Sequence, residues 1–179
     1  MRPSRSGILA VLVLVSACSQ PKEQPWHLEL DEDEKPWKEL KVQTPPYPNP
    51  ENLVRLNTGT ATSHAFYIDT SSITVGDDGV VRYVVVARAA GGASNVSFEG
   101  MRCETRQQKL YAIGHSDHTW VPARDTKWQR VVLRDLTPHH NTLYHEYFCP
   151  QRLRPTPPRQ AIDALKSGVG LRPPAGSDG

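Results

Sequence analysis

Apolar and polar residues alternate along the middle of the chain with the two-residue period of β-strands. Patterns of this kind cover residues 66–68, 71–75, 80–88, 95–103, 109–113 and 129–133. In the pattern at residues 80–88, one face carries Val81, Tyr83, Val85 and Ala87, while Arg82 and Arg88 mark the other. The sequence Gly76-Asp77-Asp78-Gly79 is a turn between two strands, and we predict a hairpin there. Together these patterns predict an antiparallel sheet of about five strands.

The strand that ends at Cys103 changes the parity of its apolar positions halfway along. Its apolar residues are first Val96 and Phe98 and then Met101 and Cys103. An extra residue near Glu99-Gly100 would place all four on one face, so we expect a β-bulge at that point of this strand.

Towards the C-terminus the apolar positions take up helical spacing. Thr137-Pro138 is a typical N-cap and first helical residue, and the apolar positions that follow, up to Cys149, are Leu143, Tyr144, Tyr147 and Phe148. A second helix is predicted between Thr156-Pro157-Pro158 and Gly168, with Ala161, Ile162 and Leu165 on its apolar face. We therefore predict an α+β fold in which one or two C-terminal helices pack on the sheet.

The N-terminus has the pattern of a cleaved export signal. Arg2 and Arg5 precede a short apolar run at residues 8–15, and Ser16-Ala17-Cys18 closes the segment. This stretch resembles a bacterial lipoprotein signal peptide, and the resemblance implies that residues 1–17 are removed and that Cys18 carries the lipid. More than one acyl chain anchors a protein stably. The alternative, a buried free cysteine at the end of a core helix, conflicts with the arginine flank and the proline-rich stretch that follows.

The residues after Cys18 indicate where the mature protein is delivered. Ser19 and Gln20 stand where an aspartate would favour retention in the inner membrane. We expect a lipid-anchored protein of a Gram-negative cell envelope, in the outer membrane and facing the periplasm. Residues 18–35 are expected to form a tether, 36–170 the folded domain and 171–179 a loose tail. Trp26 and Trp37 are unusual in a linker, and part of this segment is expected to pack back on the domain.

Composition excludes several classes of protein. With 179 residues the chain has room for one domain and its appendages. The single apolar run is too short for a multi-span membrane protein. A formal net charge of +2 excludes a strongly basic nucleic-acid binder. Removal of residues 1–17 takes away two arginines and no acidic residue, so the mature chain is neutral.

The three cysteines are too few for a disulfide-dense scaffold, but export changes how two of them are interpreted. With Cys18 lipidated, Cys103 and Cys149 remain as an even pair in an oxidising compartment. We expect a structural disulfide between them, stabilising the fold by roughly 4 kcal/mol. The alternative is two separate buried thiols. No Cys-x-x-Cys motif supports redox exchange.

Several segments, in order along the chain, resemble the CNP1-like family of Gram-negative bacterial proteins. They are residues 45–48, 51–53, 77–83, 95–103, 109–114, 128–129 and 147–150. The resemblance covers roughly residues 36–170 and implies an exported protein. It implies no catalytic residue, because no activity comes with the family.

The seven histidines give only weak candidates for chemistry. His139, His140 and His145 are close in sequence, but a helix turns by about 100° per residue and the three are not expected to converge. In the segment His115-Ser116-Asp117-His118, a loop could bring two imidazoles and a carboxylate together, without a third strong ligand. No nucleophile elbow is present. We therefore expect no catalytic residue, no metal site and no cofactor.

Two interpretations of function follow. The first is a non-catalytic binding or assembly module of the envelope, anchored to the membrane by its lipid, with another envelope protein or an anionic envelope polymer as partner and no nucleic acid. Arginines near two tryptophans would suit a polymer, although charged sheet edges with aromatic residues behind them explain the same set. These residues are Arg102, Arg106, Arg124, Arg130, Arg134, Trp120 and Trp128. The alternative is a small periplasmic hydrolase or metal-dependent enzyme that uses the loop at residues 115–118. We favour the first and expect no enzymatic activity.

Overall fold

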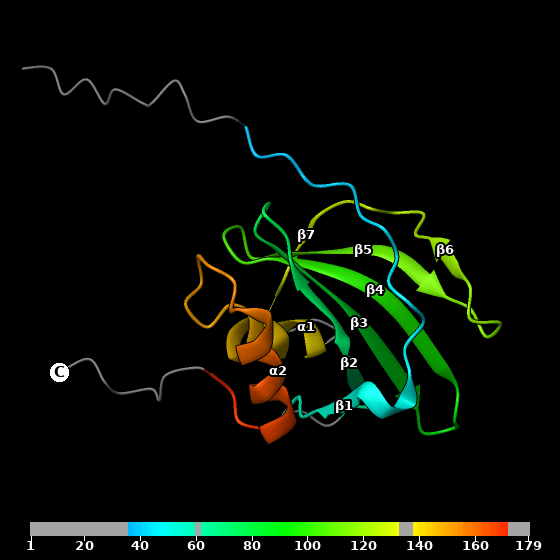
Figure 1. The fold of residues 1–179 in the computed structure, drawn as a ribbon. Coiled ribbons are helices and arrows are strands. Elements are labelled where there is room, and N and C mark those ends of the chain that lie inside the picture. The colour runs from blue at the N-terminus through cyan, green and yellow to red at the C-terminus, as the bar shows by residue number, and fades with distance from the viewer. Residues whose placement is uncertain (1–35, 60–61, 133–137, 172–179) are drawn as a thin grey trace, which may run out of the picture. The chain divides into compact units, whose positions relative to one another are not determined.

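The computed structural model of the chain describes residues 36–59, 62–132 and 138–171. Seven strands form one antiparallel sheet: β1 (Leu53–Leu56), β2 (His64–Val75), β3 (Val80–Ala89), β4 (Ser94–Arg102), β5 (Gln107–Gly114), β6 (Trp120–Pro122) and β7 (Gln129–Arg130). Strands β1 to β6 lie in sequence order, and β7 pairs with β5. A 3₁₀ turn, η1 (Pro50–Asn52), precedes them, and α1 (Pro138–Thr142), η2 (Leu143–Phe148) and α2 (Pro158–Ser167) follow. The predicted α+β fold, with two C-terminal helices on an antiparallel sheet, is confirmed (Figure 1).

The helices cover one face of the sheet and complete the larger part of the core. Tyr83 of β3 and Met101 of β4 point towards them and are fully buried against Leu143 and Phe148. The rings of Tyr83 and Phe148 are 4.9 Å apart. This is the face that the alternation in β3 predicts, and the spacing of apolar residues in the C-terminal segment matches it.

The opposite face is also buried, and the N-terminal arm (residues 37–49) contributes to its cover. Val84 and Phe98 are buried there, with Tyr47 of the arm and Trp120 of β6 packed against their cluster. The indole nitrogen of Trp120 donates to the carbonyl of Pro45. Figure 1 shows the arm on the side of the sheet away from the helices. The expectation that Trp37 packs back is correct, whereas Trp26 lies outside the described residues.

Two carboxylates hold the arm against the strands. Asp78 accepts a hydrogen bond from the backbone of Leu40, and its own carbonyl accepts one from the indole of Trp37. Glu39 of the arm accepts from Lys109 and Tyr111 of β5 and from Trp128, at 2.7, 2.8 and 3.2 Å. The turn Gly76–Gly79, expected only to join two strands, thus also fixes the arm.

The expected bulge in β4 is wrong. Val96 and Phe98 face the arm, while Met101 and Cys103 face the helices, and β4 pairs with β3 without interruption. Both faces are buried, so apolar residues of either parity are accommodated. The extra residue is on β5 instead, where the register passes from Phe98↔Ala112 to Glu99↔Leu110 and leaves out Tyr111. Gly100 leaves room for the Tyr111 ring, since a Cβ there would lie 2.7 Å from that ring.

The first predicted helix, from Pro138 up to Cys149, is not one continuous α-helix in the structure. After five α-helical residues the chain widens to the π-helical η2, in which the amide of Cys149 donates to the carbonyl of Tyr144. A disulfide joins Cys149 to Cys103 at the end of β4, with a Cα–Cα distance of 5.3 Å. The predicted second helix is α2, which ends at Gly168 in the left-handed conformation (φ +69°). The expected N-cap, Thr137, lies outside the described residues.

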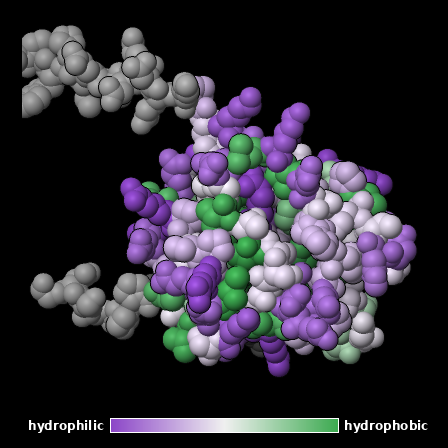
Figure 2. Space-filling view, in the orientation of Figure 1, coloured by the Kyte–Doolittle hydropathy of each residue, from purple (hydrophilic) through white to green (hydrophobic). Residues whose placement is uncertain are grey.

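Two short strands, β1 and β6, have no counterpart among the predicted elements, because three or four residues are too few to show a period. The strand expected at 129–133 is shorter than predicted: β7 covers Gln129–Arg130, and Leu133 lies outside the described residues. Within the described ranges no helix is long and apolar enough to cross a membrane. On the face shown in Figure 2, apolar side chains are interspersed among polar and charged ones.

Candidate functional site

A cleft of about 860 Å³ lies between α1 and the strands β4, β5 and β6, and the segment that follows β6 also lines it. Residues directly opposite one another on paired strands share a face. The pairs Glu99↔Leu110, Ser97↔Ile113 and Ile113↔Val121 therefore place these five side chains on the floor of the cleft. Ile113 and Val121 remain 44% and 43% exposed, so this part of the floor is apolar and open to solvent.

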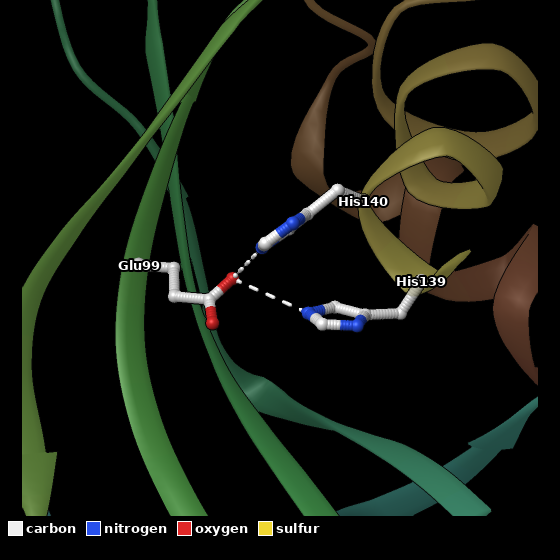
Figure 3. A group of neighbouring side chains, drawn as sticks. All are labelled: Glu99, His139 and His140. Atoms are coloured by element: carbon white, nitrogen blue, oxygen red, sulfur yellow. Dashed lines mark hydrogen bonds and ion pairs between the residues drawn. The ribbon is translucent and has the colours of Figure 1, made fainter. Parts of the chain in front are cut away.

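A carboxylate and two imidazoles form the buried end of the cleft (Figure 3). Nε2 of His140 is 2.9 Å from Oε2 of Glu99, and Nε2 of His139 is 3.8 Å from the same oxygen. Each of the three residues is 5% exposed. Glu99 comes from β4, and the two histidines come from the first turn of α1, so the cluster joins the sheet to the helix.

The environment of Glu99 keeps it ionised. Burial alone would raise the pKa of Glu99, but the charge of His140 and hydrogen bonds from both histidines hold it well below its usual range. Tyr83 stands directly across from Glu99 on β3. Burial first, and then the charge of Glu99, raise the pKa of Tyr83 well above its ordinary value, so the phenol stays protonated beside the carboxylate.

Neighbouring side chains fix the orientation of the cluster. Ser97 donates from its hydroxyl to Oε1 of Glu99 at 2.7 Å, which leaves Oε2 to the histidines. The ring of Phe66 stacks on His139 with 4.4 Å between the ring centroids. One ligand atom from each of Glu99, His139 and His140 lies within 4.8 Å of the others, so two nitrogens and one oxygen are close enough to share a cation.

The expectation that His139, His140 and His145 do not converge is therefore wrong for the first two. His139 and His140, though adjacent in a helix, converge, because both reach a single oxygen across the gap to β4. His145 is not part of this cluster; its ring lies edge-on against Tyr144 at 5.0 Å. Glu99 was not a candidate from sequence. The available signal was an acidic residue in the interior of a predicted strand, between the apolar residues Phe98 and Met101.

The second histidine candidate, at residues 115–118, is an exposed turn between β5 and β6. Oδ1 of Asp117 accepts hydrogen bonds from the amide and the hydroxyl of Thr119, and His118 stacks on Tyr47 at 4.5 Å. The carboxylate and the ring are thus engaged in shaping the turn. His115 alone of these lines the cleft.

The arginines and tryptophans considered as a binding surface are separated. Trp120 and Trp128 pack against the arm, and Arg102 lies 3.9 Å over the ring of Trp37. Arg106 lies over Tyr144, and Arg130 is on β7. Arg124 lines the cleft together with Lys127, and Arg134 lies outside the described residues. Cys18, the expected lipidation site, also lies outside them.

Comparison with known protein families gives a match that covers the folded part of the chain. A model of the CNP1-like family matches residues 32–166, which include the sheet, the arm and all three residues of the Glu99–His139–His140 cluster. Among curated proteins and among solved structures, no match to the chain is found. Since the match spans most of the sequence, the chain belongs to the CNP1-like family.

Proposed function

We propose that this protein is a lipid-anchored, non-catalytic module of the cell envelope, which binds an apolar and acidic segment of a partner protein in its cleft. The observation that carries the proposal is the apolar floor formed by the half-buried Leu110 and by the exposed Ile113 and Val121. Solvent-exposed apolar side chains gathered in a concave surface are typical of sites that bind a ligand or partner.

The charge at the rim supports an acidic occupant. Arg124 and Lys127 are exposed and line the cleft. Asp125, which lies between them in the sequence, also lines it and offsets one of the two positive charges. An anionic envelope polymer is a weaker candidate, because the tryptophans that would stack on it pack against the arm instead. The location in the envelope, and in the outer membrane in particular, is supported by the signal-peptide pattern that ends at Cys18.

The alternative is a metal-dependent hydrolase. The residues that could hold its metal are not those that the sequence analysis named. The turn at residues 115–118 does not gather its ligands, whereas Glu99, His139 and His140 do so at the buried end of the cleft. The described cleft residues include no cysteine, and its one serine hydroxyl, of Ser97, donates to Glu99, so a covalent mechanism has no nucleophile there. A hydrolase would depend on a metal-bound water, whereas the exposed apolar side chains of Ile113 and Val121 are typical of a surface that binds a protein segment. We therefore retain the binding module as the proposal.

Site-specific photo-crosslinking in living cells tests whether a partner protein binds in the cleft. A photoreactive residue at Val121 should form one dominant crosslinked product, whereas the same residue at Val169, exposed on the C-terminal side of α2, should not. Changing both Arg124 and Lys127 to Glu should lower the yield of the Val121 product at least tenfold. The matched control reverses Arg154 and Arg159, which are exposed outside the cleft, and should leave the yield unchanged.

Two results would contradict the proposal. One is equal crosslinking from Val121 and Val169. The other is a product that survives the reversal at Arg124 and Lys127. If the Val121 product were a polysaccharide or a lipid, the occupant would have to be reassigned.

A further inference from the structure

The Glu99–His139–His140 cluster has the donor set of a transition-metal site. Two imidazole nitrogens with one carboxylate oxygen bind zinc and related divalent ions, whereas calcium and magnesium prefer oxygen ligands alone. Metal–ligand bonds of about 2.0–2.2 Å place the ligand atoms of a tetrahedral site roughly 3.3 Å apart. The distances of 2.9 and 3.8 Å from Oε2 of Glu99 lie on either side of that value. The two imidazole nitrogens lie within 4.8 Å of each other, so movements of the side chains by about 1 Å or more would complete the geometry.

Burial and charge favour a cation in this place. The carboxylate of Glu99 is 5% exposed, and a carboxylate so far removed from water is stable only beside a positively charged group. A divalent ion bound by Glu99 and by one nitrogen of each imidazole would be such a group.

The surroundings already hold the ligands in position. Ser97 binds the second oxygen of Glu99, and Phe66 stacks on His139, so neither group has to be ordered when a metal arrives. The disulfide at Cys103 links the end of β4 to the segment that follows α1, and thus ties together the two elements that carry the ligands. Support of this kind by neighbouring groups is typical of metal sites.

One side of the cluster faces the cleft, which all three residues line. Three protein ligands with a fourth position open to a cavity is the arrangement in which zinc exchanges water for an incoming group. An acidic side chain in the cleft would be such a group.

We propose that Glu99, His139 and His140 bind one divalent transition-metal ion of the zinc type, with its open coordination position directed into the cleft. The metal site does not depend on the proposed partner. If the chain binds metal but gives no crosslink from the cleft floor, the proposed metal site stands and the proposed binding of a partner segment is wrong.

The test uses the untagged full chain, stripped of metal with a chelator and titrated with Zn²⁺ and with Co²⁺. Elemental analysis should find one equivalent of metal after desalting, and Co²⁺ should give the visible absorption of a four- or five-coordinate ion. Glu99→Gln and His140→Ala should each weaken binding at least tenfold. The control changes His118 to Ala, which removes the same kind of side chain from the exposed turn outside the cleft and should bind as the wild type does.

The wild type decides the outcome even if a variant does not fold. Wild-type chain that holds no Zn²⁺ or Co²⁺ after desalting overturns the inference. So does binding that persists in a folded Glu99→Gln variant, or that is lost in the His118→Ala control. Folding of each variant is checked by circular dichroism, and added Zn²⁺ should raise the melting temperature of the wild type but not of the Glu99 variant.

Discussion

The carboxylate of Asp78 is a residue-scale example of a turn side chain with long-range consequences. Its two oxygens accept from both terminal nitrogens of Arg82, at 3.0 and 2.6 Å, and from the amides of Leu40 and Val80. The side chain is 1% exposed. Burial by itself would raise the pKa of Asp78, but the hydrogen bonds from Arg82 and from the two amides lower it below the ordinary value. The ionised carboxylate therefore joins the β2–β3 hairpin to the arm.

We expect Asp78→Asn to destabilise the fold by roughly 3 kcal/mol at neutral pH, because it leaves the charge of Arg82 buried with a weaker partner. A carboxyl group with a lower pKa in the folded state stabilises the protein while it is ionised. Its contribution is complete above about pH 5 and is lost as the pH falls through the lowered pKa. Denaturant unfolding at pH 7 and at pH 3 measures this, and the difference between wild type and variant should shrink at pH 3.

Asp77→Asn is the matched control for this change, since the neighbouring Asp77 is exposed. It should have almost no effect on the free energy of unfolding. An equal loss in both variants, or a difference between Asp78→Asn and the wild type that is the same at both pH values, would contradict the role assigned to Asp78.

At the scale of elements, the helical segment from Pro138 to Phe148 is stabilised mainly by what it buries. Neither its short α-helical part nor its π-helical part is long enough to be stable alone. Leu143, Tyr147 and Phe148 are at most 2% exposed, and the disulfide at Cys149 holds the segment against the end of β4.

Tyr147→Ala should therefore cost about 3 kcal/mol or more, as truncation of other buried aromatic side chains does. The free energy of unfolding in denaturant measures this, at constant pH and with the disulfide intact. Leu153→Ala removes an apolar side chain that is 71% exposed and should change stability very little. A near-zero effect of Tyr147→Ala would mean that this face does not pack on the sheet in solution.

The elements also show which parts of the structure are predictable from sequence. Strands β3 and β4 and helix α2 follow from period and from turn or capping residues, all of which act over a few positions. The cluster at Glu99 does not, because it depends on the approach of residue 140 to residue 99 across the core. The parity change in β4 could not be interpreted correctly from sequence either. Only the arm on the second face of the sheet explains why both parities are apolar.

For the whole molecule, the lipid anchor remains a sequence prediction. If Cys18 is the first mature residue, the protein should fractionate with membranes, and Cys18→Ala should either release it or block its processing. Ser19→Ala leaves the cleavage motif in place and should change neither outcome. Intact-mass measurement of the mature chain decides the matter: a cleaved but unmodified Cys18 would contradict the prediction.

The order of the covering elements along the chain also bears on how the protein is made. The arm is synthesised before any strand, and α2 is synthesised after all of them. One face of the sheet can thus be covered early, but Tyr83 and Met101 stay open to water until α1 and η2 have emerged. A chain that ends before α1 is not a smaller domain. It is an unfinished one, with an apolar sheet face available to chaperones and proteases.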